Sequence, residues 1–252
     1  MFMYDLKLDR PTSSIHTIYG SSLHKALEIY NAYDGDKVDM FCSFDEEWHK
    51  LLATLDGKQF LGDKLYTMGL NTIETFWNSP KRKDMKPAID KAGKKIIEYY
   101  FEIPINEKYS VNGIIDLIAH NKKDLWIIDY KTAKEPYSSF KVKTDIQTIL
   151  YSYAFRELIK QGKIELNKDK EDAICFVLFT KDYDNYTGDI HFHKRKVEEW
   201  EYEKMLFIIQ GFINTIENKA YIPNYSDEGC KWCPYKKECV EFRPSLYLKE
   251  NS

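Results

Sequence analysis

One stretch of sixteen residues, Asp116 to Lys131, constrains the fold more than any other part of the chain. Two strand-like apolar runs flank a short polar break at 121–124, which is the pattern of a β-hairpin. If the turn is centred on that break, Asp116 lies directly opposite Asp129, with Cβ atoms about 5 Å apart. Lys131 then emerges on the same face as Asp129, because side chains alternate along a strand.

The two carboxylates of this hairpin need a partner, because burying an ionised carboxylate among isoleucines is costly. A salt bridge between Asp129 and Lys131 would leave Asp116 unexplained, since one lysine does not readily satisfy two buried acids. A divalent cation satisfies both, and oxygen ligands favour Mg²⁺ or Mn²⁺. A lysine beside the metal can orient the attacking water or stabilise charge on a phosphoryl group. The set therefore suits phosphodiester hydrolysis.

The bulk properties are those of a folded protein with a sizeable core, built as one large domain or two small ones from 252 residues. The net charge is −3, yet residues 81–95 are strongly basic. That stretch is compatible with gripping a phosphate backbone, and equally with a solvated helix face. No apolar run approaches the length of a membrane span, and the N-terminus lacks a secretory pattern. We therefore expect a cytoplasmic protein with no membrane partner.

The order of predicted elements favours one α/β domain in which helices flank a central mixed sheet. Its three parts are a helical N-terminal part at about 20–98, a core at about 99–218 and a cysteine-containing tail at 223–252. Helices are predicted at 20–32, 45–78, 88–98, 144–160 and 196–218. Besides the hairpin, strands are predicted at 99–106, 173–180 and 189–195.

The hairpin sequence resembles a known family. Gly113-Ile114-Ile115-Asp116, followed by Asp129-Tyr130-Lys131, is similar to the metal-binding core of the PD-(D/E)XK nuclease superfamily. More narrowly, the chain resembles the RecB-type exonuclease branch, which includes CRISPR-adaptation nucleases and phage recombination exonucleases. Gly20 to His24 is similar to that branch's Gly-x-x-x-His element, and Gln147 to Tyr151 to its Gln-x-x-x-Tyr element. The stretch 102–105 looks like the strand that precedes the aspartate hairpin. The resemblance implies a restriction-endonuclease-like core.

The resemblance also implies roles for individual residues. Mg²⁺ or Mn²⁺ would be held by His24, Asp116, Asp129 and the backbone carbonyl of Tyr130. Lys131 would be the catalytic lysine, acting with the two aspartates. Gln147 and Tyr151, one helical turn apart, would contact DNA or brace the lysine, and Glu28 and Glu102 would support the ligands from behind. Without the resemblance, a single helical histidine is more often a packing or surface residue.

Three cysteines near the C-terminus, Cys230, Cys233 and Cys239, form the second strong signal; we call them the cysteine tail. Closely spaced thiolates in a reducing compartment usually indicate a metal centre. The tail resembles the C-terminal part of an iron–sulfur staple found in a subset of the same branch. That staple normally takes a fourth cysteine before the histidine element; none is present here, and Cys42 could replace it. Iron–sulfur, zinc and no metal all stay open, and in each case the tail is structural.

These features together predict a metal-dependent DNA exonuclease that acts on single strands or duplex ends. The resemblance implies a role in recombination, repair or phage DNA metabolism, with a helicase or recombination protein as partner. Two alternatives stay open at this point. One is a non-catalytic subunit that binds DNA ends with a retained nuclease fold, and the other is an endonuclease.

Overall fold

A computed structural model describes residues 14–55, 62–90, 92–120, 125–164, 172–218, 220, 230, 233 and 235–241. The chain divides into two compact units. One comprises Ser13–Ile208 and is called the main unit here; the other comprises Met1–Thr12 with Ile209–Ser252. The sheet and the hairpin with the two aspartates belong to the main unit.

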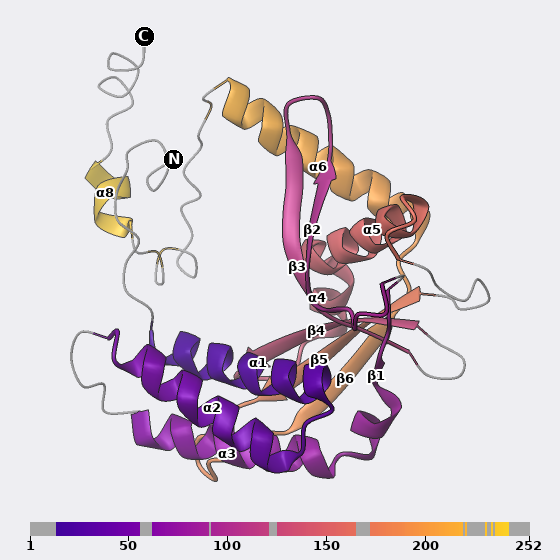
Figure 1. Cartoon of the computed structure of the whole chain (residues 1–252). Helices are drawn as coiled ribbons and strands as arrows, with labels where there is room; N and C mark the ends of the chain where they lie inside the picture. The colour runs from indigo at the N-terminus through magenta and orange to yellow at the C-terminus, as the bar shows by residue number, and fades with distance from the viewer. Residues whose placement is uncertain are drawn as a thin grey trace. The chain divides into compact units, whose positions relative to one another are not determined.

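Three helices open the main unit and form one layer against the sheet (Figure 1). They are α1 (Ile15–Tyr33), α2 (Lys37–Leu52) and α3 (Gly62–Asn78), followed by the 3₁₀ turn η1 (Pro80–Asp84). Side chains of Ser14 and Asp36 accept backbone N–H bonds at the starts of α1 and α2, which is why those helices begin there. Their buried faces carry large apolar residues such as Leu23 and Phe44.

The sheet has six strands and mixed direction, as the sequence predicted. The strands are β1 (Lys86–Pro87), β2 (Ile97–Pro104), β3 (Ser110–His120), β4 (Leu125–Ala133), β5 (Asp172–Thr180) and β6 (Ile190–Arg195). Their order is β1-β3-β4-β5-β6, and β2 also pairs with β3. Only the β4–β5 pair is parallel among the described strands. The crossover between those two strands contains α4 (Ser139–Thr144) and α5 (Ile146–Lys160).

Each face of the sheet has its own apolar cluster. The cluster under α1–α3 includes Leu117, Ile128 and Phe179, whereas the cluster under α5 includes Ile118 and Phe155. Figure 1 shows α1–α3 on one side of the sheet and α4 with α5 on the other. Two further helices are described, α6 (Glu199–Glu217) and α8 (Lys236–Glu241). No helix of the described part is both long and apolar enough to cross a membrane.

The predicted helix at 88–98 is wrong, so the helical N-terminal part ends earlier than residue 98. Ile89 instead bridges Lys95, and β2 has begun by Ile97. The Asp90 side chain accepts bonds from the N–H groups of Ala92 and Lys94, and Gly93 has a φ of 80°. This local bonding and the left-handed glycine favour a tight turn over a helix.

Candidate active site

The two aspartates lie where the strands of the hairpin separate. The register of β3 and β4 pairs Leu117 with Ile128, as predicted, and the recorded pairing ends there. Asp116 and Asp129 occupy the next position along both strands. Beyond this point β3 stays paired with β2, while β4 stays paired with β5. The two aspartates therefore lie at the fork where β3 and β4 separate, on strands that both remain paired in the sheet.

Asp116 is the more strongly hydrogen-bonded of the two acids. It is 9% exposed, and its Oδ2 accepts the N–H of Tyr130 at 2.7 Å. His24 Nδ1 approaches the same oxygen at 3.8 Å. Burial raises the pKa of Asp116 to about 6, against the opposing effects of the Tyr130 N–H and Lys131. Burial also lowers the pKa of His24, although its hydrogen bond to the Tyr130 backbone opposes this. A neutral imidazole is the form that binds metals.

Asp129 begins a chain of polar contacts that ends at Tyr151. Lys131 Nζ lies 3.0 Å from Asp129 Oδ1 and donates to Gln147 Oε1 at 2.9 Å, and Gln147 Nε2 donates to the Tyr151 hydroxyl at 2.6 Å. Asp129 is only 2% exposed, and burial raises its pKa to about 7 despite Lys131. Its other oxygen, Oδ2, is buried without a hydrogen-bond partner. Lys131 therefore compensates one side of this carboxylate and leaves the other free to bind a cation.

Glu98 belongs to the same site, and the sequence reasoning missed it. The β2–β3 register pairs Ile97 with Leu117 and Tyr99 with Ile115, which puts Glu98 opposite Asp116. Ligand atoms of His24, Glu98 and Asp116 all lie within 4.8 Å of one another. Burial and the charge of Asp116 raise the pKa of Glu98 to about 7. The sequence predicted a helix at 88–98 and a strand only from residue 99. Glu98 could have been found only if the start of β2 had been predicted correctly.

The two carboxylates expected to support the ligands differ in their positions. Glu28 accepts a bond from Lys25 at 2.9 Å and lines a cavity of about 500 Å³ together with His24 and Glu98. Glu102 instead accepts a bond from Ser110 at 2.7 Å on the exposed side of the β2–β3 hairpin. Of these two, Glu28 is the one beside the cavity.

The donor set fits a hard divalent cation. The ligand atoms of two carboxylates and one imidazole, those of Glu98, Asp116 and His24, lie together at the fork. Asp129 is outside this group, and its orphaned Oδ2 shows that the described side chains do not use up its bonding capacity. Such oxygen-rich sets suit Mg²⁺, and a histidine makes Mn²⁺ equally acceptable. Burial raises the pKa of all three acids, and the charge of Asp116 raises the pKa values of Glu98 and Asp129 further.

Several residues of the basic stretch serve packing rather than a free surface. The Arg82 guanidinium lies 4.0 Å from the Trp77 ring centroid and donates to the Tyr30 hydroxyl at 2.7 Å. Lys95 pairs with Asp34 at 2.7 Å. The stretch is therefore only partly available to guide a phosphate backbone.

The cysteine tail lies outside the main unit, and its three thiols are partly exposed and free. Cys42 is exposed on α2, and Cys175 is buried in β5, as expected for a core thiol. Within the described part of the chain, His24, Glu98 and Asp116 are the one group of three or more such side chains close enough to share an ion. A metal in the cysteine tail stays a prediction.

A comparison with protein families agrees with the fold. A family model described as PD-(D/E)XK nuclease superfamily matches residues 1–240. The chain belongs to this superfamily and is a nuclease by family. It is also 24% identical over 199 residues to the Gene 69 protein of Mycobacterium phage D29. That match covers 78% of this chain but 66% of the phage protein, slightly less than two thirds of its length.

A solved structure titled "Crystal structure of SSO0001" is also similar to this chain. The similarity covers 87% of this chain and 92% of the other, at 13% sequence identity and a TM-score of 0.36. We draw no conclusion from so distant a likeness.

Proposed function

We propose that this protein is a metal-dependent DNA exonuclease whose active site is the fork between β3 and β4. The proposal is carried by the ligand atoms of His24, Glu98 and Asp116, which lie within 4.8 Å of one another. At the same fork, Asp129 keeps one oxygen without a partner among the described residues and has Lys131 at 3.0 Å from the other. Mg²⁺ or Mn²⁺ bound there supplies an activated water and neutralises charge on the scissile phosphate. Every other part of the chemistry falls to the chain's own residues.

The main chain at Tyr130 also takes part in the site. Its N–H donates to Asp116, and N–H and C=O of one strand residue point toward the same neighbouring strand. The Tyr130 carbonyl therefore faces the fork as well, where His24 is hydrogen-bonded to the Tyr130 backbone. This supports Tyr130 as a backbone ligand beside His24, Asp116 and Asp129.

Lys131 is proposed to stabilise the negative charge that develops on the phosphoryl oxygens. Its ammonium group is held between Asp129 and Gln147, so it is oriented before substrate arrives. Tyr151 in turn orients the Gln147 amide. Gln147 and Tyr151 thus position the lysine. Gln147 is half-buried and can also meet a DNA strand, whereas Tyr151 is 7% exposed and belongs to the apolar cluster under α5.

The finer aspects of this proposal follow the RecB-type resemblance. It favours degradation from DNA ends, a role in recombination, repair or phage DNA metabolism, and cooperation with a helicase or recombination protein. It also favours an iron–sulfur cluster held by the cysteine tail. The likeness to a phage protein agrees with phage DNA metabolism.

Digestion of labelled DNA tests the proposal. Wild type with Mn²⁺ should shorten linear single-stranded or duplex DNA from its ends and leave a closed circle intact. Lys131→Ala should lower the rate by roughly 10²- to 10³-fold, the typical loss when a charge-stabilising group is removed. Lys163→Ala, an exposed lysine elsewhere, is the matched control.

Three results would contradict the proposal. Equal digestion by wild type and Lys131→Ala would refute the assigned mechanism. Cutting of the closed circle would instead identify an endonuclease. Binding of DNA ends in EDTA, with no degradation in either metal, would identify a non-catalytic subunit.

A further inference from the structure

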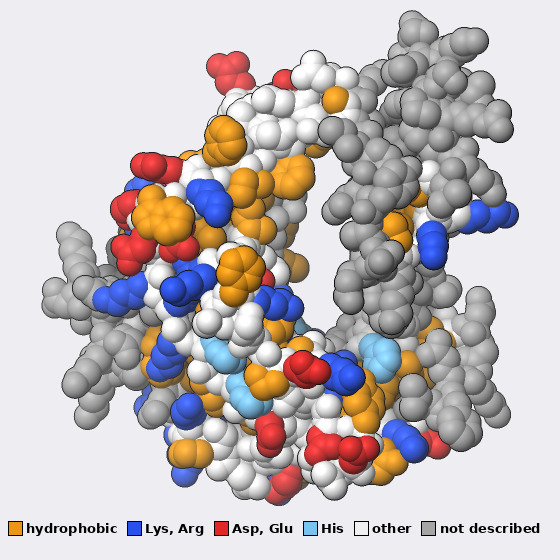
Figure 2. Space-filling model, turned by 180° about the vertical axis from the view of Figure 1, so that it is seen from behind, with side chains coloured by type: hydrophobic (Ala, Val, Ile, Leu, Met, Phe, Trp, Pro, Cys, Tyr) orange, Lys and Arg blue, Asp and Glu red, His pale blue; other side chains and the backbone are white. Residues whose placement is uncertain are grey.

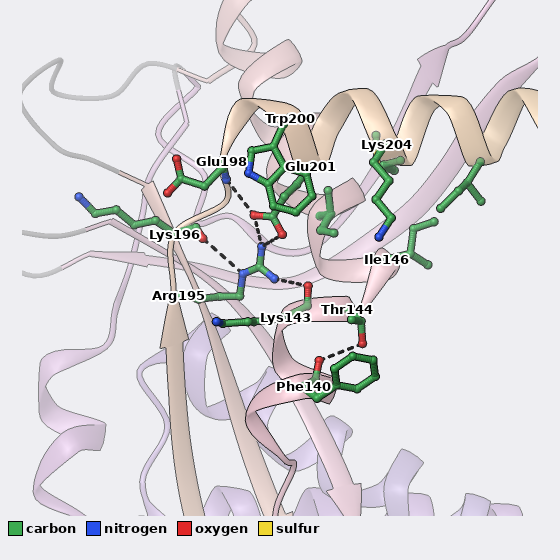
Figure 3. Close-up of a pocket in the computed structure, with 13 residues that line it drawn as sticks. Phe140, Lys143, Thr144, Ile146, Arg195, Lys196, Glu198, Trp200, Glu201 and Lys204 are labelled. Carbon is green, nitrogen blue, oxygen red and sulfur yellow. Dashed lines mark hydrogen bonds and ion pairs between the residues drawn. The ribbon is translucent and has the colours of Figure 1, made fainter.

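A second cavity lies on the α5 side of the main unit, beside α4 and the start of α6. Its volume is about 550 Å³, within the usual range for ligand-binding clefts. Figure 3 shows its lining, which combines two exposed rings, Phe140 and Trp200, with the side chains of Lys143 and Lys204. Phe140 is 74% and Trp200 60% exposed. Large rings this accessible at a cleft are unusual unless they meet a ligand.

A buried ion pair builds one wall of this cavity. Arg195 and Glu201 pair through two contacts, and each side chain is 10% exposed. Arg195 Nη1 also donates to the carbonyls of Val142 at 3.2 Å and Lys143 at 2.6 Å. One guanidinium thereby joins the end of α4 to β6 and to the first turn of α6 (Figure 3). The cleft is held open by these bonds, so a ligand would find it preformed.

The charge around the cleft is positive. Arg195 and Glu201 neutralise each other, and the lining also holds Lys143 and Lys204 against the carboxylate of Glu198. No ion pair is recorded for Lys143 or Lys204 with any described residue. In the view of Figure 2, basic, acidic and hydrophobic side chains are interspersed on the side of the molecule where α5 and α6 lie. Rings between lysines suit a chain of bases joined by phosphates.

The cleft also adjoins the proposed active site. Phe176 is the β5 partner of Asp129, and the Tyr137 ring packs edge-on against Phe176. Lys141 of α4 lies 3.8 Å from the Tyr137 ring centroid. On α5, Ile146 lines the cleft, whereas its neighbour Gln147 holds the catalytic lysine. Contacts through Tyr137 and α4 thus connect the fork with the cleft.

We propose that this cleft binds single-stranded DNA next to the active site, with Trp200 and Phe140 stacking on bases while Lys143 and Lys204 contact phosphates. The inference rests on the proposed function, because the nuclease reaction supplies the strand. The cleft would prefer single-stranded DNA, because aromatic rings can stack only on bases that are not paired in a duplex.

Binding measured without catalysis tests the cleft separately from the nuclease reaction. The probe is a fluorescent oligothymidylate of about 20 nucleotides, long enough to cover a single-strand site. Its anisotropy is followed with the full chain in EDTA. Trp200→Ala should weaken binding by roughly 5- to 150-fold, the usual loss for one stacked base. Trp200→Phe should restore most of the affinity. Phe207→Ala, a 79% exposed ring on α6 outside the cleft, should bind like wild type.

The phosphate contacts have their own signature. For single strands each contact contributes about 0.7 to the slope of log K against log salt. The double variant Lys143→Ala/Lys204→Ala should therefore reduce that slope by roughly 1.4. The control Lys163→Ala should leave it unchanged.

The outcomes separate this inference from the nuclease proposal. If wild type digests DNA but Trp200→Ala binds the oligomer as tightly as Phe207→Ala, the cleft proposal is overturned and the nuclease stands. If wild type does not digest DNA but the cleft variants lose affinity, the cleft proposal stands alone. If Trp200→Phe binds as poorly as Trp200→Ala, stacking is not the cause and the proposal fails. Self-association that Trp200→Ala abolishes, with DNA binding intact, would assign the cleft to a second copy.

Discussion

Asp129→Asn should stabilise the metal-free protein above neutral pH. The buried carboxylate has a pKa raised to about 7, mainly by desolvation, against an ordinary value of 3.8. At 1.36 kcal/mol per pH unit, the charged form costs the folded state up to about 4 kcal/mol. That is a large share of the 5–15 kcal/mol by which whole domains are stable. An asparagine has nearly the same shape and carries no charge.

The sign of the effect follows from proton binding. Between about pH 4 and pH 7 the folded protein holds a proton on Asp129 that the unfolded chain has released. The free energy of unfolding of wild type therefore falls as pH rises through this window. At pH 8 in EDTA the asparagine variant should be more stable than wild type by up to about 4 kcal/mol, and near pH 3.5 the two should be similar. The gain is limited because Lys131 loses its partner, although it keeps the bond to Gln147.

Urea unfolding followed by fluorescence at several pH values, in EDTA and in Mn²⁺, measures this effect. Mn²⁺ should stabilise wild type by about 2.7 kcal/mol at a hundred times its dissociation constant and the variant by less. Glu135→Gln, an exposed carboxylate, is the control for loss of one charge. A variant less stable than wild type at pH 8 without metal, or one with an unchanged pH dependence, would refute the reasoning.

Three further predictions concern other parts of the molecule. Gly69→Ala should destabilise the protein by about 1–3 kcal/mol, because the added methyl would clash with the Phe44 ring. Gly211→Ala should stabilise it by roughly 0.5–1 kcal/mol, since no neighbouring atom of the described residues lies within 4 Å of the added methyl. Urea unfolding compares the two variants. Gln147→Ala should lower the rate of DNA digestion more than the affinity for DNA, because it releases Lys131; steady-state kinetics beside anisotropy would show the reverse if Gln147 only bound DNA. The cysteine tail should bind iron and colour anaerobically purified protein brown, and colourless, iron-free protein that remains folded and active would exclude an essential cluster.

The hairpin could be predicted from sequence because two apolar runs flank one short polar break, and a turn centred on that break pairs Leu117 with Ile128. Alternation does not set the register here, because both faces of β4 are buried, with Ile127 in one apolar cluster and Ile128 in the other. The cap of α5 was predictable for a similar local reason, since the Asp145 side chain accepts the N–H of Thr148.

The rest of the site depends on contacts between distant parts of the chain. Glu98 joins the fork through a local bend of β2 and its pairing with β3, neither of which leaves a periodic signal. The sequence suggests that Arg82 is a free surface cation, yet its guanidinium packs against the rings of Tyr30 and Trp77. The cleft beside Trp200 is likewise assembled from two separate segments, 140–149 and 195–208. A local sequence pattern does not predict these contacts between distant segments, because tertiary packing determines which side chains meet.

The backbone of Glu98 has a further consequence. Its φ of 45° lies in the left-handed region, where a residue with a Cβ is strained by roughly 1–2 kcal/mol. Glycine there would relieve that strain and also remove a partly buried acid, so the fold alone would favour its loss. A trade-off between stability and function is thus concentrated in a single residue. If the protein were selected for stability alone, and not for DNA cleavage, Glu98 should be the first residue of the site to be replaced.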